Sequence, residues 1–532
     1  MRRNVRKRAV QHGGTTGITV WRQELSPVNF LERSGTVHAD RVAVVDGDVS
    51  YTWRHFRARS RRLASALRGT GLRKGDRIAF LACNCEPLLL AHFGVAQAGG
   101  VLVAINTRLS SDEIAYIIED SGAGTVFYTP ELDKQLSKIP RSVCRLNTRR
   151  DLEEFLTTGA DAEVESWLTD ENDLITINYT SGTTGRPRGV MYHHRGAYLN
   201  ALAMALGHGL TAGSAYLWTL PMFHCNGWTF PWALAAVGAR SICISRIEPE
   251  VAWRLFDEDV SHFCAAPTVL SMLANSPAAH CLKRSVRLLT AGAPPSPALI
   301  SRMTELNFEL DHVYGLTETY GPFTINVSQP NLVDLTPNEQ ARIKARQGFP
   351  NVCAGDVRVV DEAMRDVPAD GRTMGEVVMR GNAVMCGYFA DEKATSRAFD
   401  GGWFHSGDLA VRHPDCSIEL RDRKKDIIIL GGENVSTIEV EQAVSTYPAV
   451  LECAVIAVPN DTWGEVPKAF VTLKPGATAS EANIIEHCRS QIAHFKVPRS
   501  VEFGPLPKTS TGKVQKYILR EREWRGTGRR IN

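Results

Sequence analysis

The sequence predicts an α/β protein with a large N-terminal domain of parallel or mixed sheets covered by helices, followed by a small α+β C-terminal domain. Three observations predict this fold class. Short β-branched runs alternate with helical segments from residue 21 onward, which is typical of parallel sheets covered by helices. A compact α/β pattern restarts after a charged run at residues 421–426. The chain of 532 residues is also too long for one ordinary core.

Strands and helices alternate clearly within residues 41–128. Strand-like runs occur at residues 41–46, 76–81, 101–105 and 123–128, and helical spacing occurs at residues 52–68, 86–99 and 111–121. Gly71 lies just past the first of these helices, and Ser110 or Ser111 fits the N-cap of the third. Residues 154–172 are acidic and have no strong period, which predicts a surface linker.

The domain boundary is placed at the charged run. We expect residues 21–422 to form the N-terminal domain and residues 423–532 to form the small C-terminal domain. Residues 1–20 are basic and predict a disordered tail. They lack the apolar stretch of a secretory signal, and an organelle transit peptide is the alternative interpretation.

Composition excludes several classes of function. A net charge of +3 on a chain of this length predicts no nucleic-acid partner. The 12 cysteines are scattered without zinc-site spacing, which indicates reduced thiols and a cytoplasmic protein. Apolar runs stay below the roughly 18 residues that a membrane span needs, so we expect no membrane span.

A loop rich in glycine and hydroxyl residues follows the strand-like run at residues 175–179. It reads Thr180-Ser-Gly-Thr-Thr-Gly-Arg-Pro-Arg-Gly-Val190. Its glycines let the backbone approach a ligand closely, and backbone amides in such loops converge on anions. Arg186 and Arg188 add positive charge, although the Walker A spacing is absent. The loop predicts a phosphate site, and a flexible surface loop is the alternative.

This loop resembles the signature of the adenylate-forming (AMP-binding) superfamily, which includes acyl-CoA synthetases, aryl-CoA ligases, luciferases and peptide-synthetase adenylation domains. The resemblance covers residues 21–522, and further motifs follow in the family's order. It implies an acyl-CoA synthetase with ATP and Mg²⁺ as cofactors, CoA as co-substrate and a mobile C-terminal domain. The family usually has lysine where this chain has Arg188, so the charge is kept while a planar fork replaces a point charge.

The resemblance implies a role for each residue that matches a nucleotide motif. The phosphates of ATP would be bound by Thr180, Ser181, Gly182, Thr183, Thr184, Gly185 and Arg188, with Thr184 also a metal ligand. Gly292, Ala293 and Pro294 would lie on the adenine side, next to Tyr314 and Gly315. Thr317 would bond the phosphate and Glu318 would hold Mg²⁺, in keeping with the preference of this cation for oxygen ligands. Asp408 and Arg423 would bind the ribose.

The remaining motifs concern the acid, the thiol and the catalytic lysine. Lys513, in the motif at residues 507–514, would stabilise charge on the phosphoryl oxygens during adenylation. Lys425 falls at the family's hinge, and Gly431, Gly432 and Glu433 would approach the site beside a thiol channel. In the segment at residues 220–228, His224 would lie near the carboxylate, with Gly227 and Trp228 in the substrate pocket. A structural histidine and a core tryptophan are the alternatives.

Together these motifs predict a two-step enzyme. A short-chain, medium-chain or aryl carboxylic acid and Mg-ATP would give acyl-AMP and pyrophosphate, and the thiol of CoA would then displace AMP after rotation about Lys425. One alternative is a freestanding ligase that loads an acyl carrier protein. Another is a non-catalytic nucleotide-binding homologue, for which Arg188 is the one hint. The acid and the oligomeric state, including a homodimer, stay open.

Overall fold

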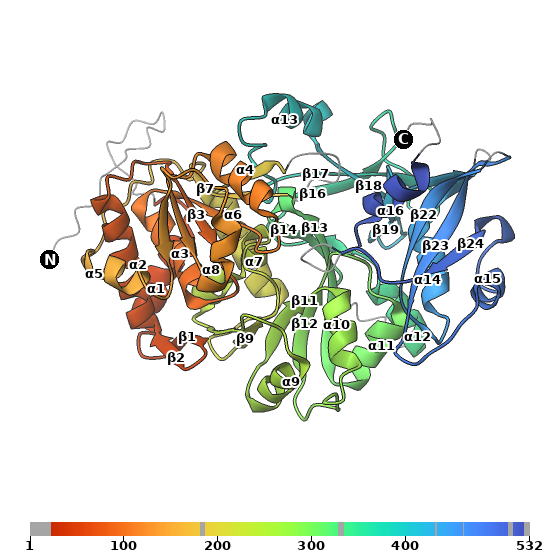
Figure 1. Ribbon diagram of the computed structural model, residues 1–532, viewed down its shortest axis with the longest axis horizontal. Coiled ribbons are helices and arrows are strands. Elements are labelled where there is room, and N and C mark those ends of the chain that lie inside the picture. The colour runs from red at the N-terminus through yellow and green to blue at the C-terminus, as the bar shows by residue number, and fades with distance from the viewer. Residues whose placement is uncertain are drawn as a thin grey trace, which may run out of the picture.

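The computed structural model describes residues 23–180, 187–327, 335–430, 433–460, 462–508 and 514–525. It confirms the predicted fold class: three sheets with their helices form a large domain, and a fourth sheet forms a smaller C-terminal domain. In Figure 1 the six-stranded sheet with its helices lies at one end of the molecule and the small domain, in blue, at the other. No helix within these ranges is long and apolar enough to cross a membrane.

The six-stranded sheet has the strand order β6-β5-β3-β4-β7-β8. Its strands are parallel except for the β7–β8 pair. They are β3 (Arg77–Leu81), β4 (Val101–Ala104), β5 (Thr125–Tyr128), β6 (Cys144–Asn147), β7 (Leu174–Tyr179) and β8 (Gly189–His193). The helices of this region are α2 (Trp53–Gly69), α3 (Glu86–Ala98), α4 (Ser111–Ser121), α5 (Leu152–Thr157) and α6 (His194–Gly207), with the 3₁₀ turn η1 (Pro130–Leu136).

The predicted helix starts are confirmed at the level of individual hydrogen bonds. The Ser110 hydroxyl accepts from the backbone N–H of Glu113, and the Glu113 carboxylate accepts from the N–H of Ser110, which is a capping box. Thr52 caps α2 in the same sense by accepting from the N–H of His55. These local contacts explain why sequence patterns located the helices well.

The nine-stranded sheet forms the centre of the large domain, with the order β15-β14-β13-β12-β11-β9-β10-β1-β2. Its strands are β1 (Val42–Asp46), β2 (Val49–Thr52), β9 (Ala215–Trp218), β10 (Arg240–Cys243), β11 (His262–Ala265), β12 (Val286–Thr290), β13 (Phe308–Leu316), β14 (Gly321–Ile325) and β15 (Phe349–Pro350). The helices are α1 (Val28–Val37), α7 (Cys225–Trp228), α8 (Phe230–Val237), α9 (Pro249–Glu258), α10 (Pro267–Ala274), α11 (Pro297–Glu305) and α12 (Pro337–Lys344). Alternating residues of β9 enter two separate hydrophobic cores, one on each face.

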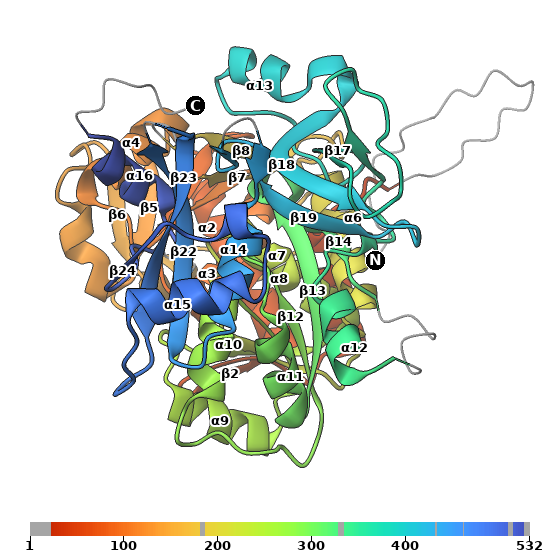
Figure 2. The ribbon, with the colours of Figure 1, turned by 90° about the vertical axis from the view of Figure 1, so that its right-hand side faces the viewer.

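Two smaller sheets complete the chain. The antiparallel sheet β16 (Asp356–Val360), β17 (Met374–Arg380), β18 (Phe404–Arg412) and β19 (Ile418–Arg423) is accompanied by α13 (Glu392–Ala398) and η4 (Asp400–Gly402). The small domain contains β20 (Ile428–Leu430), β21 (Glu433–Val435), β22 (Val450–Asn460), β23 (Gly464–Leu473), β24 (Ser500–Phe503), α14 (Thr437–Ser445), α15 (Glu481–Arg489), η5 (His494–Lys496) and α16 (Lys516–Trp524). It has a hydrophobic core of its own, and Figure 2 shows this sheet from the side of α15.

The surface linker predicted at residues 154–172 is wrong in part. The first residues of that segment belong to α5. The guanidinium carbon of Arg68 lies 4.1 Å from the ring centre of Trp167, and the same indole lies beside Gly99. Glu171 is buried and pairs with Arg195 at 2.8 Å. The acidic composition suggested exposure, but partners distant in sequence cover these side chains.

Candidate active site

The proposed phosphate loop connects the last two strands of the six-stranded sheet. The N–H of Thr180 donates to the carbonyl of Arg188 at 3.0 Å and so closes the base of the loop. Because β7 runs parallel to β4, the loop leaves at the carboxyl end of the parallel strands, where ligands bind in open α/β sheets. Ser181, Gly182, Thr183, Thr184 and Gly185 lie outside the described residues.

Arg188 makes two contacts that suit a planar guanidinium. Its Nε lies 3.7 Å from Oδ2 of Asp391, and its guanidinium carbon lies 5.5 Å from the ring centre of Tyr388. The Tyr388 hydroxyl donates to Oε1 of Glu318 at 2.9 Å. Sequence motifs did not point to Tyr388 or Asp391, although both lie close to Arg188 and Glu318.

We expect Arg188→Lys to lower the rate of pyrophosphate release by no more than about fivefold, because an exposed ion pair contributes at most about 1 kcal/mol. The charge toward Asp391 and toward a phosphate is kept, while the flat contact with Tyr388 is weakened. Steady-state kinetics of Arg188→Lys and Arg188→Ala would measure this. If the rate falls as far in Arg188→Lys as in Arg188→Ala, the planar geometry of the guanidinium is needed and its charge alone is not enough.

Tyr314, Asp408 and Arg423 converge from three strands. The Tyr314 hydroxyl donates to Oδ2 of Asp408 at 2.7 Å, and Nε of Arg423 lies 2.6 Å from Oδ1 of Asp408. Asp408 is only 3% exposed. A carboxylate has about four lone-pair positions, so both oxygens can still accept from a diol. The group could therefore accept hydrogen bonds from a ribose, which is the role that the resemblance implies and which stays a prediction.

Electrostatics keep Tyr314 and Arg423 in their protonated, hydrogen-bond-donating forms. Burial, followed by the charge of Asp408, raises the pKa of Tyr314 well above its ordinary value, so the phenol remains a donor. Burial alone lowers the pKa of Arg423, but the Asp408 carboxylate raises it, and the net pKa lies above the ordinary value. Tyr314 and Arg423 consequently remain donors toward Asp408.

Two glycines of the predicted adenine side serve different purposes. A Cβ on Gly315 would lie 1.8 Å from the carbonyl oxygen of Gly321 in the neighbouring strand β14, so only glycine fits there. Gly292 has a φ of +92° and open space around its Cβ position, so backbone conformation explains it. Gly292, Ala293 and Pro294 follow the carboxyl end of β12, beside β13.

His224 and Thr317 are brought together by Cys225, a residue that motif reasoning passed over. The Cys225 thiol donates to Oγ1 of Thr317 at 3.5 Å and lies 3.8 Å from Nε2 of His224. The Tyr192 hydroxyl donates to the carbonyl of Thr317 at 2.5 Å, within the 3₁₀ turn η2 (Thr317–Thr319) that also carries Glu318. Burial raises the pKa of Cys225 to about 12, so the thiol remains neutral.

Five consecutive residues at this point, Cys225, Asn226, Gly227, Trp228 and Thr229, have left-handed φ values between +49° and +64°. Such a run is strained for residues other than glycine and persists only where its surroundings hold it. Asn178 does so, because its amide donates to Oδ1 of Asn226 at 2.7 Å and its own Oδ1 accepts from the Asn226 N–H. A Cβ on Gly227 would meet the Trp218 ring at 2.6 Å, and Trp228 is buried against Gly321.

The hinge and lysine motifs are described only in part. Lys425 lies between β19 and β20, where burial lowers its pKa. Glu433 is exposed at the start of β21. Gly431, Gly432 and Lys513 lie outside the described residues, and Lys508 and Val514 form a β-bridge across the segment that contains Lys513.

Two family models match the chain. The family described as AMP-binding enzyme matches residues 31–389, and the family described as AMP-binding enzyme C-terminal domain matches residues 439–513. An acetate–CoA ligase of Humulus lupulus is 44% identical, and a peroxisomal acetate/butyrate–CoA ligase of Arabidopsis thaliana is 42% identical; each match covers 93% of this chain and 94% of the relative.

The fold also resembles solved structures over both domains. ATP-bound MatB from Rhodopseudomonas palustris matches with a TM-score of 0.83 at 26% identity, covering 94% of this chain and 100% of that one. The family matches, the full-length relatives and the shared fold lead to one conclusion: the chain belongs to the AMP-binding enzyme family.

Proposed function

We propose that this chain is an AMP-forming ligase that activates a short carboxylic acid as acyl-AMP and transfers the acyl group to CoA. The observation that carries the proposal is the direct connection of two polar clusters through β13 and η2. Tyr314, Asp408 and Arg423 form a place for a nucleoside. Three residues after Tyr314, Thr317 of η2 accepts from the Cys225 thiol, which also lies 3.8 Å from Nε2 of His224. A nucleoside phosphate and an acid could thus lie side by side, which lowers the entropic cost of their reaction.

Each residue has a proposed task in the first step. Asp408 accepts from the ribose hydroxyls, while Tyr314 and Arg423 hold its carboxylate in place. Thr317 donates to the phosphate, because the Cys225 thiol donates to its oxygen and leaves its own proton available. His224 lies beside the carboxylate of the acid. Lys513 stabilises the charge that develops on the phosphoryl oxygens.

Glu318 fits a divalent cation. Its Oε1 accepts from Tyr388, which orients a carboxylate of the kind Mg²⁺ prefers. When bound, the metal would neutralise charge on the phosphate oxygens. Thr184, the other ligand expected from the sequence, lies outside the described residues.

A short acid is favoured by two observations. The relatives named above are called acetate and acetate/butyrate ligases. At the proposed carboxylate site, a Cβ on Gly227 would lie 2.6 Å from the buried Trp218 ring, and Trp228 is buried against Gly321, so two large side chains pack closely there. A cytoplasmic location, a homodimer and the domain boundary between residues 422 and 423 stay predictions.

Pyrophosphate release with ATP, Mg²⁺ and a panel of short, medium, branched and aryl acids would test the proposal. We expect turnover with short acids, and mass spectrometry should detect the matching acyl-CoA when CoA is present. If only an added acyl carrier protein is acylated, the assignment of CoA is wrong. The absence of pyrophosphate release with every acid would indicate a non-catalytic homologue.

A further inference from the structure

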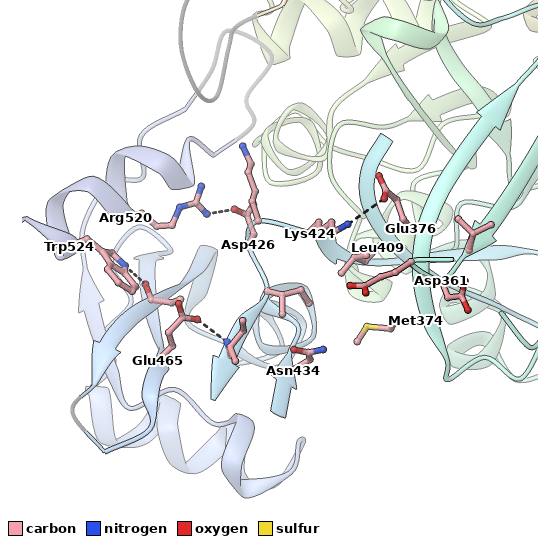
Figure 3. Close-up of a pocket in the computed structure, with 17 residues that line it drawn as sticks. Asp361, Met374, Glu376, Leu409, Lys424, Asp426, Asn434, Glu465, Arg520 and Trp524 are labelled. Carbon is pink, nitrogen blue, oxygen red and sulfur yellow. Dashed lines mark hydrogen bonds and ion pairs between the residues drawn. The ribbon is translucent and has the colours of Figure 1, made fainter. Parts of the chain in front are cut away.

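The segment between the two domains is anchored at both ends by ion pairs. On the side of the large domain, Arg423 is bound to Asp408 at 2.6 Å. On the side of the small domain, Asp426 pairs with Arg520 of α16, and both side chains are nearly buried (Figure 3). Only Lys424 and Lys425 lie between these anchors, so a change of domain orientation must occur largely at these two residues.

A cavity of about 450 Å³ lies against this segment. Its walls come from both domains and from the segment itself, and they include Met374 and Glu376 of the large domain, Lys424 and Lys425, and Asn434 and Arg520 of the small domain (Figure 3). Close packing resists movement, so an open space on one side lets the backbone change its dihedral angles.

Two hydrogen bonds cross from the large domain to the first turn of α14. The N–H of Thr437 donates to Oδ2 of Asp422 at 2.5 Å, and the Ser436 hydroxyl donates to the carbonyl of Arg421. We call these four residues the α14 latch. Asp422 is 3% exposed, and a buried carboxylate at a helix N-terminus forms a strong, charge-assisted contact.

The small-domain side of the latch is held rigidly. Nζ of Lys516, at the start of α16, lies 2.6 Å from Oγ1 of Thr437 and 2.7 Å from Oε1 of Glu441. The Ser436 hydroxyl also accepts from the N–H of Glu439 and caps α14. The first turns of α14 and α16 therefore move together, and the latch connects both to β19.

We propose that the α14 latch holds the small domain in the orientation used for adenylation and opens before thiol transfer. This inference rests on the proposed function. The present orientation is assigned to adenylation because the chain matches ATP-bound MatB over 94% of its length and 100% of that chain. Arg421 and Asp422 precede the two-residue hinge and Ser436 and Thr437 follow it, so a large rotation there must break both hydrogen bonds.

Two substitutions at one position isolate the latch. Thr437→Ala removes the hydroxyl that Lys516 contacts but keeps the backbone donor to Asp422. Thr437→Pro removes the donor as well, and proline is well tolerated at the first position of a helix. Relative to Thr437→Ala, we expect Thr437→Pro to slow pyrophosphate release about tenfold or more, because a hydrogen bond to a charged group is lost. Thioester formation from pre-made acyl-AMP should not slow.

Limited trypsin digestion gives a readout that does not need activity. Lys424 is largely exposed, and we expect cleavage after Lys424 or Lys425 to be faster in Thr437→Pro and in Asp422→Asn than in the wild type. Asp415→Asn is the matched control, because Asp415 pairs with Arg346 within the large domain and contacts no residue of the latch. Circular dichroism would check that each variant is folded.

The latch is refuted if Thr437→Pro and Thr437→Ala behave alike in both half-reactions and in digestion, or if both half-reactions slow equally. If the wild type releases no pyrophosphate with any acid, the proposed function fails instead. In that event, digestion of the same variants would still show whether the contacts hold the two domains together.

Discussion

Lys513→Ala is expected to slow acyl-AMP formation about 10²- to 10³-fold, because a positioned cation of this kind stabilises charge that develops on the phosphoryl oxygens. Thioester formation from pre-made acyl-AMP should be largely unaffected, since no phosphoryl charge develops in that step. Pyrophosphate release and mass spectrometry of the thioester would measure the two half-reactions separately.

Lys508→Ala is the matched control for this experiment. Lys508 belongs to the same motif, but its Nζ lies 2.5 Å from a carboxylate oxygen of Glu452 and is used within the small domain. Its loss should change adenylation little. Equal losses in both half-reactions of Lys513→Ala would contradict the role that we assign to Lys513.

Asp408→Ala is expected to lower kcat/KM for ATP about 10²-fold or more, because hydrogen bonds to a charged group are lost. The substitution removes the acceptor for the ribose and leaves the donors of Tyr314 and Arg423 without their partner. The melting temperature of the free protein should also fall, since Arg423 loses the carboxylate that compensates its burial.

Thermal shift with AMP would separate binding from stability. AMP should raise the melting temperature of the wild type and of Asp415→Ala, a control that removes a half-exposed carboxylate and leaves Arg346 without this ion pair. Asp408→Ala should show little shift at the same concentration of AMP. An undiminished shift would mean that the ribose is bound elsewhere.

Local contacts explain which parts of the fold were predictable. The capping box of Ser110 and Glu113 and the apolar faces of α2 and α4 depend on residues three or four positions apart, and such patterns are visible in a sequence. The linker predicted at residues 154–172 was wrong in part, because the partial burial of Trp167 depends on Arg68 and Gly99, which are distant in the chain.

Some residues of the candidate site were likewise found from the sequence, and others were found only in the structure. Resemblance to family motifs located Tyr314, Asp408 and Arg423 one at a time. No sequence motif pointed to Cys225, which lies between His224 and Thr317, or to Tyr388, which lies beside Glu318. The reason is distance along the chain: Cys225 and Thr317 are 92 residues apart, and Tyr388 and Glu318 are 70 residues apart.

The sequence by itself determined the types of elements, because propensities and caps are short-range properties. Its motifs also supplied the proposed phosphate loop and the candidate residues of the site, which stay predictions. Only the tertiary structure decided which of these residues meet. Pairing of β18 with β19, and the packing of β13 from another sheet, bring Arg423 and Tyr314 to the Asp408 carboxylate. The packing of α14 on β19 joins Asp422 to Thr437. Contacts of this kind depend on the packing of distant segments, and a local pattern carries little information about that packing.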